Sequence, residues 1–139
     1  MKNPLYLILL TCSLFSCGAK DNIQQKAAED FVVQIMVTGQ WAVTAYTKGT
    51  ADITSDFAPY RFQFQTNRTI DALKNSVVEK SGTWDANATA RTITSNFTSA
   101  STPLILLNGT WTITNSTLTT VEAAQTINGE ERVLKLAKQ

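Results

Sequence analysis

The 139-residue chain contains no histidine, and its two cysteines, Cys12 and Cys17, both lie near the N-terminus. Without histidine the chain cannot form a serine–histidine or cysteine–histidine nucleophile pair, or a zinc site with an imidazole ligand. Cysteines that lie only at the N-terminal edge cannot staple a core further along the chain. Catalysis by this chain would therefore have to rely on carboxylates or lysines.

An excess of charge of one sign is also missing. The chain has 12 Lys and Arg against 11 Asp and Glu, a net charge of +1, and its basic residues are scattered from Lys2 to Lys138. Nucleic-acid surfaces and polybasic membrane patches need basic residues that are in excess and gathered together. We therefore expect no nucleic-acid binding, and the length predicts one domain.

The patterns of common catalytic and metal sites are absent as well. The paired carboxylates Glu29-Asp30 and Glu130-Glu131 are neighbours in sequence, so their side chains point apart and are not placed for shared acid–base work. The six glycines are dispersed, so no phosphate-binding loop is formed, and no Asp/Asn-rich calcium loop occurs. We expect no enzymatic activity, no catalytic residues, no metal site and no cofactor.

The N-terminus predicts export. Residues 1–3 include Lys2, and an apolar stretch over residues 4–14 follows, which is typical of a secretory signal peptide over residues 1–16 and is too short to span a bilayer stably. Leu14-Phe15-Ser16-Cys17 resembles the bacterial lipobox, which implies cleavage before Cys17 and acylation of Cys17, with palmitate-type chains. Cys12, after Leu9-Leu10-Thr11, is a second candidate, and an ordinary secretory signal remains an alternative. An acylated cysteine would hold the protein on a membrane. We expect an outer-membrane lipoprotein, and the sequence does not distinguish the periplasmic from the surface side of that membrane.

Residues 17–37 are predicted to form a tether and a short helix. Small and polar residues follow Cys17 over positions 18–22, as a tether requires. Ile23, Ala27, Phe31 and Ile35 then recur at intervals of four, which predicts an amphipathic helix over residues 21–38 that would plug one end of the following domain or lie along its outside. Gly39 would end this helix.

The rest of the chain, residues 38–139, predicts an all-β domain. Threonine, aromatic and β-branched residues alternate with turn signals every eight to twelve positions. We expect eight strands, and a ninth strand or a lid at residues 103–107. The eight strands are expected at residues 40–48, 60–66, 69–74, 77–86, 91–97, 110–114, 117–123 and 132–137. Asparagine marks the turns expected at residues 66–68, 75–76, 87–89, 115–116 and 128–129, and connections this short join antiparallel neighbours in a meander.

The strands predict a barrel with one buried face. Tyr60, Phe62 and Phe64 share one parity while polar residues occupy the other. The first strand is expected to turn Trp41, Val43 and Ala45 inward, with Thr44 and Tyr46 on the wet face. Eight such strands leave no unpaired edge strand when they close into a barrel. Several strands are shorter than the roughly 9–11 residues of a transmembrane strand, which argues against a membrane-spanning barrel.

A Gly-x-Trp figure occurs three times, in Gly39-Gln40-Trp41, Gly82-Thr83-Trp84 and Gly109-Thr110-Trp111. Together with Phe62-Gln63-Phe64 and the turn at Asn67, these repeats resemble the lipocalin-like domains of small secreted lipoproteins from Bacteroidetes-type bacteria. The resemblance implies an eight-stranded antiparallel up-and-down barrel in the cell envelope and suggests ligand binding. The glycines would allow close backbone approach, and each indole would fill a barrel end.

Parity nominates residues that would line a ligand site inside the barrel: Phe62, Phe64, Ile93 and Phe97. Aromatic residues in such a pattern are more often part of a solid core than ligand contacts. Our first hypothesis is that a lipid-anchored barrel binds a small apolar molecule. The alternative is a protein-interaction or hydrolase-inhibitor module on a filled barrel, acting through the loop at residues 47–58 or 98–107, or a structural envelope component.

Overall fold

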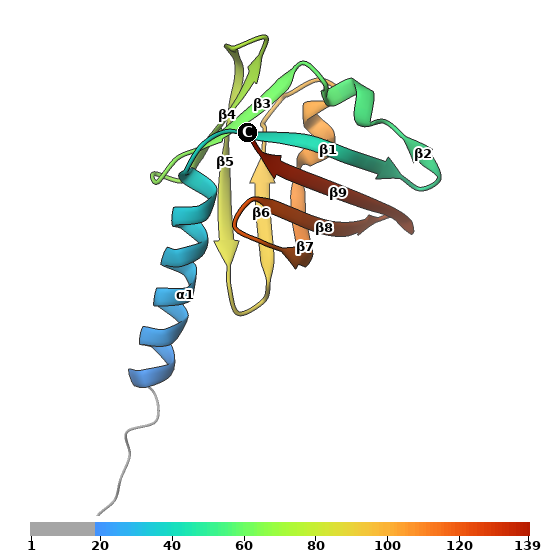
Figure 1. The fold of residues 1–139 in the computed structure, drawn as a ribbon. Coiled ribbons are helices and arrows are strands. Elements are labelled where there is room, and N and C mark those ends of the chain that lie inside the picture. The colour runs from blue at the N-terminus through green and yellow to red at the C-terminus, as the bar shows by residue number, and fades with distance from the viewer. Residues whose placement is uncertain (1–18) are drawn as a thin grey trace, which may run out of the picture.

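The computed structural model describes residues 19–139 (Figure 1). The predicted signal peptide, Cys12 and Cys17 lie outside the described residues. Helix α1 covers Ala19–Val37 and is followed by Gly39, whose φ of 76° is the left-handed conformation that ends helices. Residues 19 and 20, predicted as part of the tether, already belong to this helix. Within residues 19–139, no helix is both long and apolar enough to cross a bilayer.

Eight main strands and one short strand follow α1. They are β1 (Trp41–Lys48), the two-residue β2 (Ala51–Asp52), β3 (Tyr60–Phe64), β4 (Thr69–Lys74), β5 (Val77–Asn87), β6 (Thr92–Asn96), β7 (Gly109–Ser116), β8 (Thr120–Ile127) and β9 (Glu130–Lys138). Two 3-10 helices, η1 (Thr54–Phe57) and η2 (Leu104–Leu107), lie in the β2–β3 and β6–β7 connections. Residues 103–107, predicted as a ninth strand or a lid, therefore contain η2 and no strand.

The sheet closes on itself. From β3 onward each strand pairs antiparallel with the next, and β1 pairs with both β3 and β9. The β1–β9 ladder runs from Trp41 opposite Lys138 to Lys48 opposite Arg132, whereas β1 meets β3 at Trp41 opposite Phe62. The first and last strands therefore lie side by side (Figure 1). The predicted eight-stranded antiparallel meander barrel with a preceding helix is confirmed, and residues 19–139 form a unit with its own core.

Two hairpin turns use the predicted asparagines. Asn75-Ser76 and Asn128-Gly129 each place two consecutive residues at positive φ, as tight two-residue hairpins require. The turn predicted at residues 115–116 is wrong, because both residues belong to β7 and the chain turns at residues 117–119. There Thr117 Oγ1 accepts hydrogen bonds from the backbone N–H of Thr119 and Thr120. The threonine hydroxyl thus stabilises the turn, as an asparagine side chain was expected to do.

A β-bulge changes which side chains of β1 face the core. The register with β9 shifts between Val43 and Ala45, so Thr44 is an extra residue and the alternation reverses after it. Tyr46, predicted on the wet face, is fully buried, while Ala45 is only partly buried. The prediction for Tyr46 is wrong because one inserted residue moves every later side chain to the other face.

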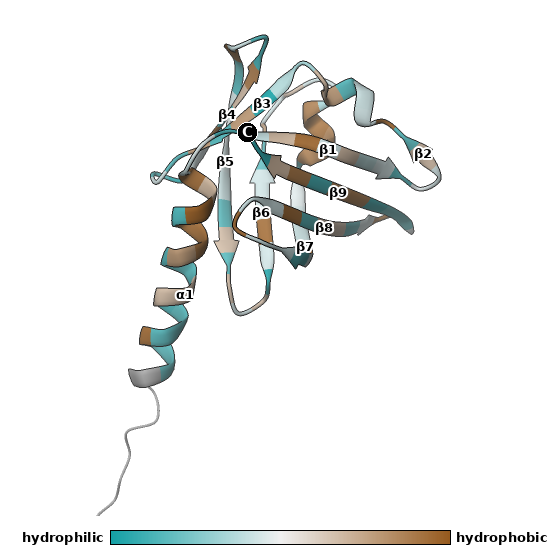
Figure 2. Cartoon of the chain, in the orientation of Figure 1, coloured by the Kyte–Doolittle hydropathy of each residue, from teal (hydrophilic) through white to brown (hydrophobic). Residues whose placement is uncertain are grey.

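The core fills the barrel from both ends. Figure 2 shows apolar and polar residues alternating along the strands, and the end of α1 nearest the barrel is mostly apolar. Met36 from α1 enters the core, and Leu104 and Leu107 enter it from η2. Between them the aromatic side chains pack against one another: Phe64 and Trp84 meet edge to face with centroids 5.1 Å apart, and Phe62 lies 6.3 Å from Phe97.

Candidate functional site

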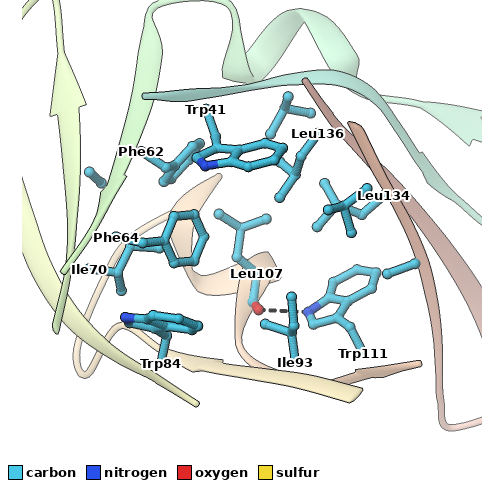
Figure 3. Packing of buried hydrophobic residues seen from close by; sticks show 14 of the residues in the cluster. Trp41, Phe62, Phe64, Ile70, Trp84, Ile93, Leu107, Trp111, Leu134 and Leu136 are labelled. Atoms are coloured by element: carbon cyan, nitrogen blue, oxygen red, sulfur yellow. Dashed lines mark hydrogen bonds between the residues drawn. The ribbon is translucent and has the colours of Figure 1, made fainter. Parts of the chain in front are cut away.

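The four residues predicted to line a ligand site do come together inside the barrel. Phe62, Phe64, Ile93 and Phe97 all border one internal cavity, and Figure 3 shows Leu107 pointing between the rings at its centre. The volume of this cavity is about 40 Å³, whereas sites for drug-sized ligands begin at roughly 300 Å³. In this structure the barrel interior is therefore filled by its own side chains.

The small cavity is also almost without polar groups. Ser95 is the one polar residue that borders it, and its hydroxyl donates a 2.6 Å hydrogen bond to the backbone carbonyl of Leu107. A buried water needs two to four polar partners, and cavities lined by apolar groups stay dry. The cavity therefore has room for a small apolar group and offers no binding partner for a polar one.

The three Gly-x-Trp tryptophans are all buried, and each ties a segment outside the strands to the barrel. Trp41 Nε1 donates a 2.9 Å hydrogen bond to the carbonyl of Met36 at the end of α1. Trp84 Nε1 donates to Gln65 O at 3.1 Å, in the β3–β4 turn. Trp111 Nε1 donates to Leu107 O at 2.8 Å, in η2 (Figure 3). Because each indole N–H finds a carbonyl partner, these large rings can be buried without an unsatisfied donor.

The glycines of the same repeats meet local requirements that a side chain would violate. A Cβ atom on Gly82 would lie 2.5 Å from the backbone oxygen of Asn96 and 2.8 Å from the Phe97 ring. Gly109 has a φ of 112°, and Gly39 one of 76°, both left-handed values that favour glycine. The glycines thus permit close approach at Gly82 and the turns into β1 and β7.

Tyr46 joins the two long connections at one end of the barrel. Its hydroxyl donates a 2.8 Å hydrogen bond to Leu106 O in η2, and its ring stacks on Phe57 of η1 with centroids 5.1 Å apart. Its backbone N–H donates to Thr54 Oγ1 at 2.9 Å. Burial raises the pKa of the Tyr46 phenol. We call η1 and η2 together the loop platform.

The loop platform shares its end of the barrel with the β4–β5 hairpin. In an antiparallel meander, alternate connections lie at the same end, so the β1–β3, β4–β5, β6–β7 and β8–β9 connections all lie at this end of the barrel. Three exposed apolar side chains lie there, Ile105 in η2 and Val77 and Val78 at the start of β5, and Val77 is 69% exposed. The sequence predicted the two loops but not this contact, because the bulge that turns Tyr46 inward leaves no signal in the alternation.

A tyrosine–carboxylate contact holds the rim of the same end. Tyr60 Oη donates a 2.5 Å hydrogen bond to Glu79 Oε2, and Lys74 Nζ lies 3.5 Å from Glu79 Oε1. Burial of the phenol, followed by the hydrogen bond to the negative Glu79 carboxylate, raises the pKa of Tyr60 to about 12. At neutral pH Tyr60 is therefore a hydrogen-bond donor and not a base.

At the opposite end, the C-terminal turn of α1 is fastened to the barrel. Lys138 Nζ donates a 3.0 Å hydrogen bond to Ile35 O, and Gln63 Nε2 donates to Gly39 O at 3.1 Å. A cation at a helix C-terminus also interacts favourably with the helix dipole. With Met36 buried, α1 plugs this end through its last turn, while its earlier turns are exposed. Each of the two predicted placements therefore describes a different part of the helix: the last turn plugs the barrel end, and the earlier turns lie outside the barrel.

The carboxylates set aside by the sequence lie on the surface. Glu130 is paired with Lys48 and Arg132, at 3.8 and 3.2 Å, and Asp30 is paired with Lys26 at 3.3 Å. Across residues 19–139, no three His, Cys, Asp or Glu side chains are grouped so that they could hold a metal ion.

The fold is similar to that of a DUF4847 family protein from Bacteroides vulgatus, known from a crystal structure. The two share 18% sequence identity with a TM-score of 0.54, over 78% of this chain and 99% of that one. At this identity the likeness concerns the fold alone. Neither the protein-family models nor the curated proteins include a match to the sequence.

Proposed function

We propose that the protein is a lipid-anchored lipoprotein of the bacterial outer membrane whose lipocalin-like barrel serves as a filled scaffold for contact with another protein. The observation that carries the proposal is the volume of the internal cavity, about 40 Å³, which leaves no room for a carried molecule of ordinary size. A filled barrel can still present a rigid surface. The proposal includes no catalytic step and no cofactor.

The loop platform is the surface that best fits such a contact. Tyr46 and Phe57 fix η1, and the Tyr46 hydroxyl fixes η2, so the two connections are held in one arrangement before any partner binds. Preorganised loops lose little conformational entropy on binding. Exposed apolar groups at the same end of the barrel, Ile105 in η2 and Val77 in β5, supply the kind of area that is buried in protein interfaces.

The anchor is proposed from the sequence, because Cys17 lies outside the described residues. Helix α1 begins at Ala19, only two positions after Cys17, and its C-terminal end is fastened to the barrel. A helix of 19 residues, at about 1.5 Å per residue, is about 28 Å long. An acyl group on Cys17 would therefore hold the barrel on a helical stalk and not on a flexible tether.

Metabolic labelling tests the anchor. Cells that express the full chain are grown with an alkyne analogue of palmitate, and label on the protein is compared among wild type, Cys17→Ser and Cys12→Ser. We expect label on wild type and on Cys12→Ser, and none on Cys17→Ser. Label that persists in Cys17→Ser, or none on wild type, would contradict the assignment.

Site-specific photocrosslinking in intact cells tests the contact. A photoreactive amino acid is placed at Ile105 or Val77 at the platform end, and at Leu118 in the β7–β8 turn at the other end as the control. Leu118 is 62% exposed, so it is as accessible as the test positions. We expect one adduct of defined mass from Ile105 and from Val77, and none from Leu118. The same adducts from all three positions, or an adduct from Leu118 alone, would contradict the proposal.

A small apolar ligand remains a second candidate, since Phe62, Phe64, Ile93 and Phe97 border one apolar cavity closed by Leu107 of η2. Movement of η2 would enlarge this space. Native mass spectrometry and titration with the apolar fluorescent probe 1-aminoanthracene test whether the barrel binds such a ligand. Saturable uptake by the wild-type barrel would favour a carrier. A barrel that stays empty, while Leu107→Ala takes up the probe, would show that only the truncated side chain makes room.

A further inference from the structure

A second hollow lies outside the barrel, between α1 and the wall formed by β5, β6 and β7. Its volume is about 250 Å³, compared with about 40 Å³ for the cavity inside the barrel. On the helix side it is bordered by Ala28, Phe31 and Val32, and on the barrel side by Ala86 and Ile113. We call this hollow the helix–barrel groove. Ligand sites of this kind combine mainly apolar walls with a few placed polar groups.

The apolar wall of the helix–barrel groove is not covered by the protein. Phe31 is 56% exposed although it faces the barrel across the groove, and Ile113 is only partly buried. A large aromatic ring left in water at a concave surface gains free energy when an apolar group covers it. The groove is not a loose gap, because the last turn of α1 is held by Trp41 and Lys138.

Arg91 provides one charge at the groove. It occupies the β5–β6 turn, where its backbone N–H donates to Ala88 O and its carbonyl accepts from the N–H of Ile113. Of the basic side chains over residues 21–139, only those of Arg91 and Lys80 make no hydrogen bond, ion pair or ring contact. No carboxylate is among the described residues that border the groove. A guanidinium group free of partners favours an anion, and it can bind a carboxylate through two parallel hydrogen bonds.

We propose that the helix–barrel groove binds an amphipathic monocarboxylate, with a short unbranched apolar tail against Phe31 and Ile113 and its carboxylate on Arg91. The combination of an apolar wall and one unpaired cation selects this chemistry. A cation would be repelled by Arg91, and a neutral alcohol of the same length would leave the guanidinium group unpaired. The site lies outside the barrel, so it does not depend on whether the barrel interior opens.

The probe is decanoate, compared with decanol and decyltrimethylammonium, each below the concentration at which it aggregates. Binding to residues 19–139 is measured by calorimetry and by ¹H–¹⁵N chemical shifts. We expect saturable binding of decanoate at one site, with shifts on both sides of the groove. Because Arg91 is exposed and a surface ion pair contributes up to about 1 kcal/mol, decanol should bind roughly 2- to 5-fold more weakly than decanoate. The ammonium probe should not bind.

Two pairs of variants assign the site. Arg91→Gln should weaken decanoate to the level of decanol and leave decanol unchanged, whereas Arg91→Lys should keep the preference for the anion. Ala28→Leu should fill the groove and remove binding, while Ala27→Leu, an exposed position next to it that does not border the groove, should bind as wild type does.

Several outcomes would overturn the proposal. These are equal binding of the three probes, decanoate binding unaffected by Arg91→Gln, absence of decanoate binding, and chemical-shift changes confined to barrel residues such as Phe64. The last would instead favour a site in the barrel interior. Crosslinking at the loop platform reports on the other end of the barrel, so failure here and failure of the proposed function are separate results.

Discussion

The indole N–H of Trp41 donates a 2.9 Å hydrogen bond to the backbone carbonyl of Met36, five residues earlier, and both side chains are buried. This bond joins the last turn of α1 to the first residue of β1. It also occupies a carbonyl at the helix end, where no intrahelical donor is available. The position of α1, and with it the helix–barrel groove, depends on this contact.

Trp41→Phe tests the contact. The substitution leaves the Met36 carbonyl without its partner in a buried place, so the free energy of unfolding should fall by about 1–3 kcal/mol, plus the loss from the smaller ring. Urea unfolding measures this change, and hydrogen exchange should show reduced protection of the α1 amides. Lys26→Met, on the exposed part of α1, should change stability by no more than about 0.5 kcal/mol. Equal protection of α1 in wild type and Trp41→Phe would contradict the expected role.

Gly82→Ala should be among the costlier single changes in β5. The added Cβ would lie 2.5 Å from Asn96 O, a backbone atom of the paired strand, so the β5–β6 ladder must shift. We expect a loss of about 1–3 kcal/mol of stability, the usual cost of overpacking. Thr83→Ala, at the exposed neighbouring position, is the matched control and should cost much less. Thermal unfolding of the two variants side by side decides the matter, and similar losses would be evidence against the close approach.

Leu107→Ala and Ile105→Ala separate the buried and exposed faces of η2. Leu107 is buried and points into the core, and its carbonyl, which accepts from Ser95 and Trp111, is unaffected by the change. Leu107→Ala should therefore cost about 2–5 kcal/mol through the cavity it creates. Ile105→Ala should cost about 0.5 kcal/mol or less. Chemical denaturation of both variants checks the difference, and a small loss in Leu107→Ala would mean that η2 does not close the core as described.

The Tyr60 phenol predicts a loss of stability at alkaline pH. Its pKa in the folded protein is raised from the ordinary value of 10 to about 12, so the folded state holds this proton more tightly than the unfolded chain. The resulting stabilisation is fully present below about pH 10 and is lost as pH rises from about 10 towards 12. Urea unfolding between pH 9 and 12 should show this decline, and Tyr60→Phe should make it less steep. Part of the slope should remain, because the pKa of Tyr46 is also raised.

Glu79→Gln provides the control for that assignment. Removal of the carboxylate charge should lower the pKa of Tyr60, because a neutral amide no longer disfavours the phenolate. An absorbance titration at about 295 nm, or ¹³C NMR of labelled tyrosine, follows the ionisation directly. If the pKa of Tyr60 in Glu79→Gln equals that in wild type, burial alone accounts for the shift.

The sequence by itself determined the class of the fold, because strand periodicity and turn chemistry are local properties. The alternation of Tyr60, Phe62 and Phe64 with polar neighbours survives intact in β3, and asparagines mark the Asn75 and Asn128 hairpins as predicted. Short connections leave little choice of topology, and eight strands that must hide their edges close into a barrel. The alternation along each strand also predicted which side chains share the inner face, and the four residues selected in this way, Phe62, Phe64, Ile93 and Phe97, border one cavity.

The tertiary structure alone decided what that face encloses. The extra residue at Thr44 turned Tyr46 inward, and the entry of Met36 and Leu107 from the two ends filled the space that a ligand would need. A bulge is a mismatch between two paired strands, and packing depends on residues far apart in the chain. Neither the bulge nor the packing produces a periodic pattern in the sequence of a single strand. For the same reason the helix–barrel groove, assembled from α1, β5 and β7 together with the turn that carries Arg91, became visible only when those elements were brought together.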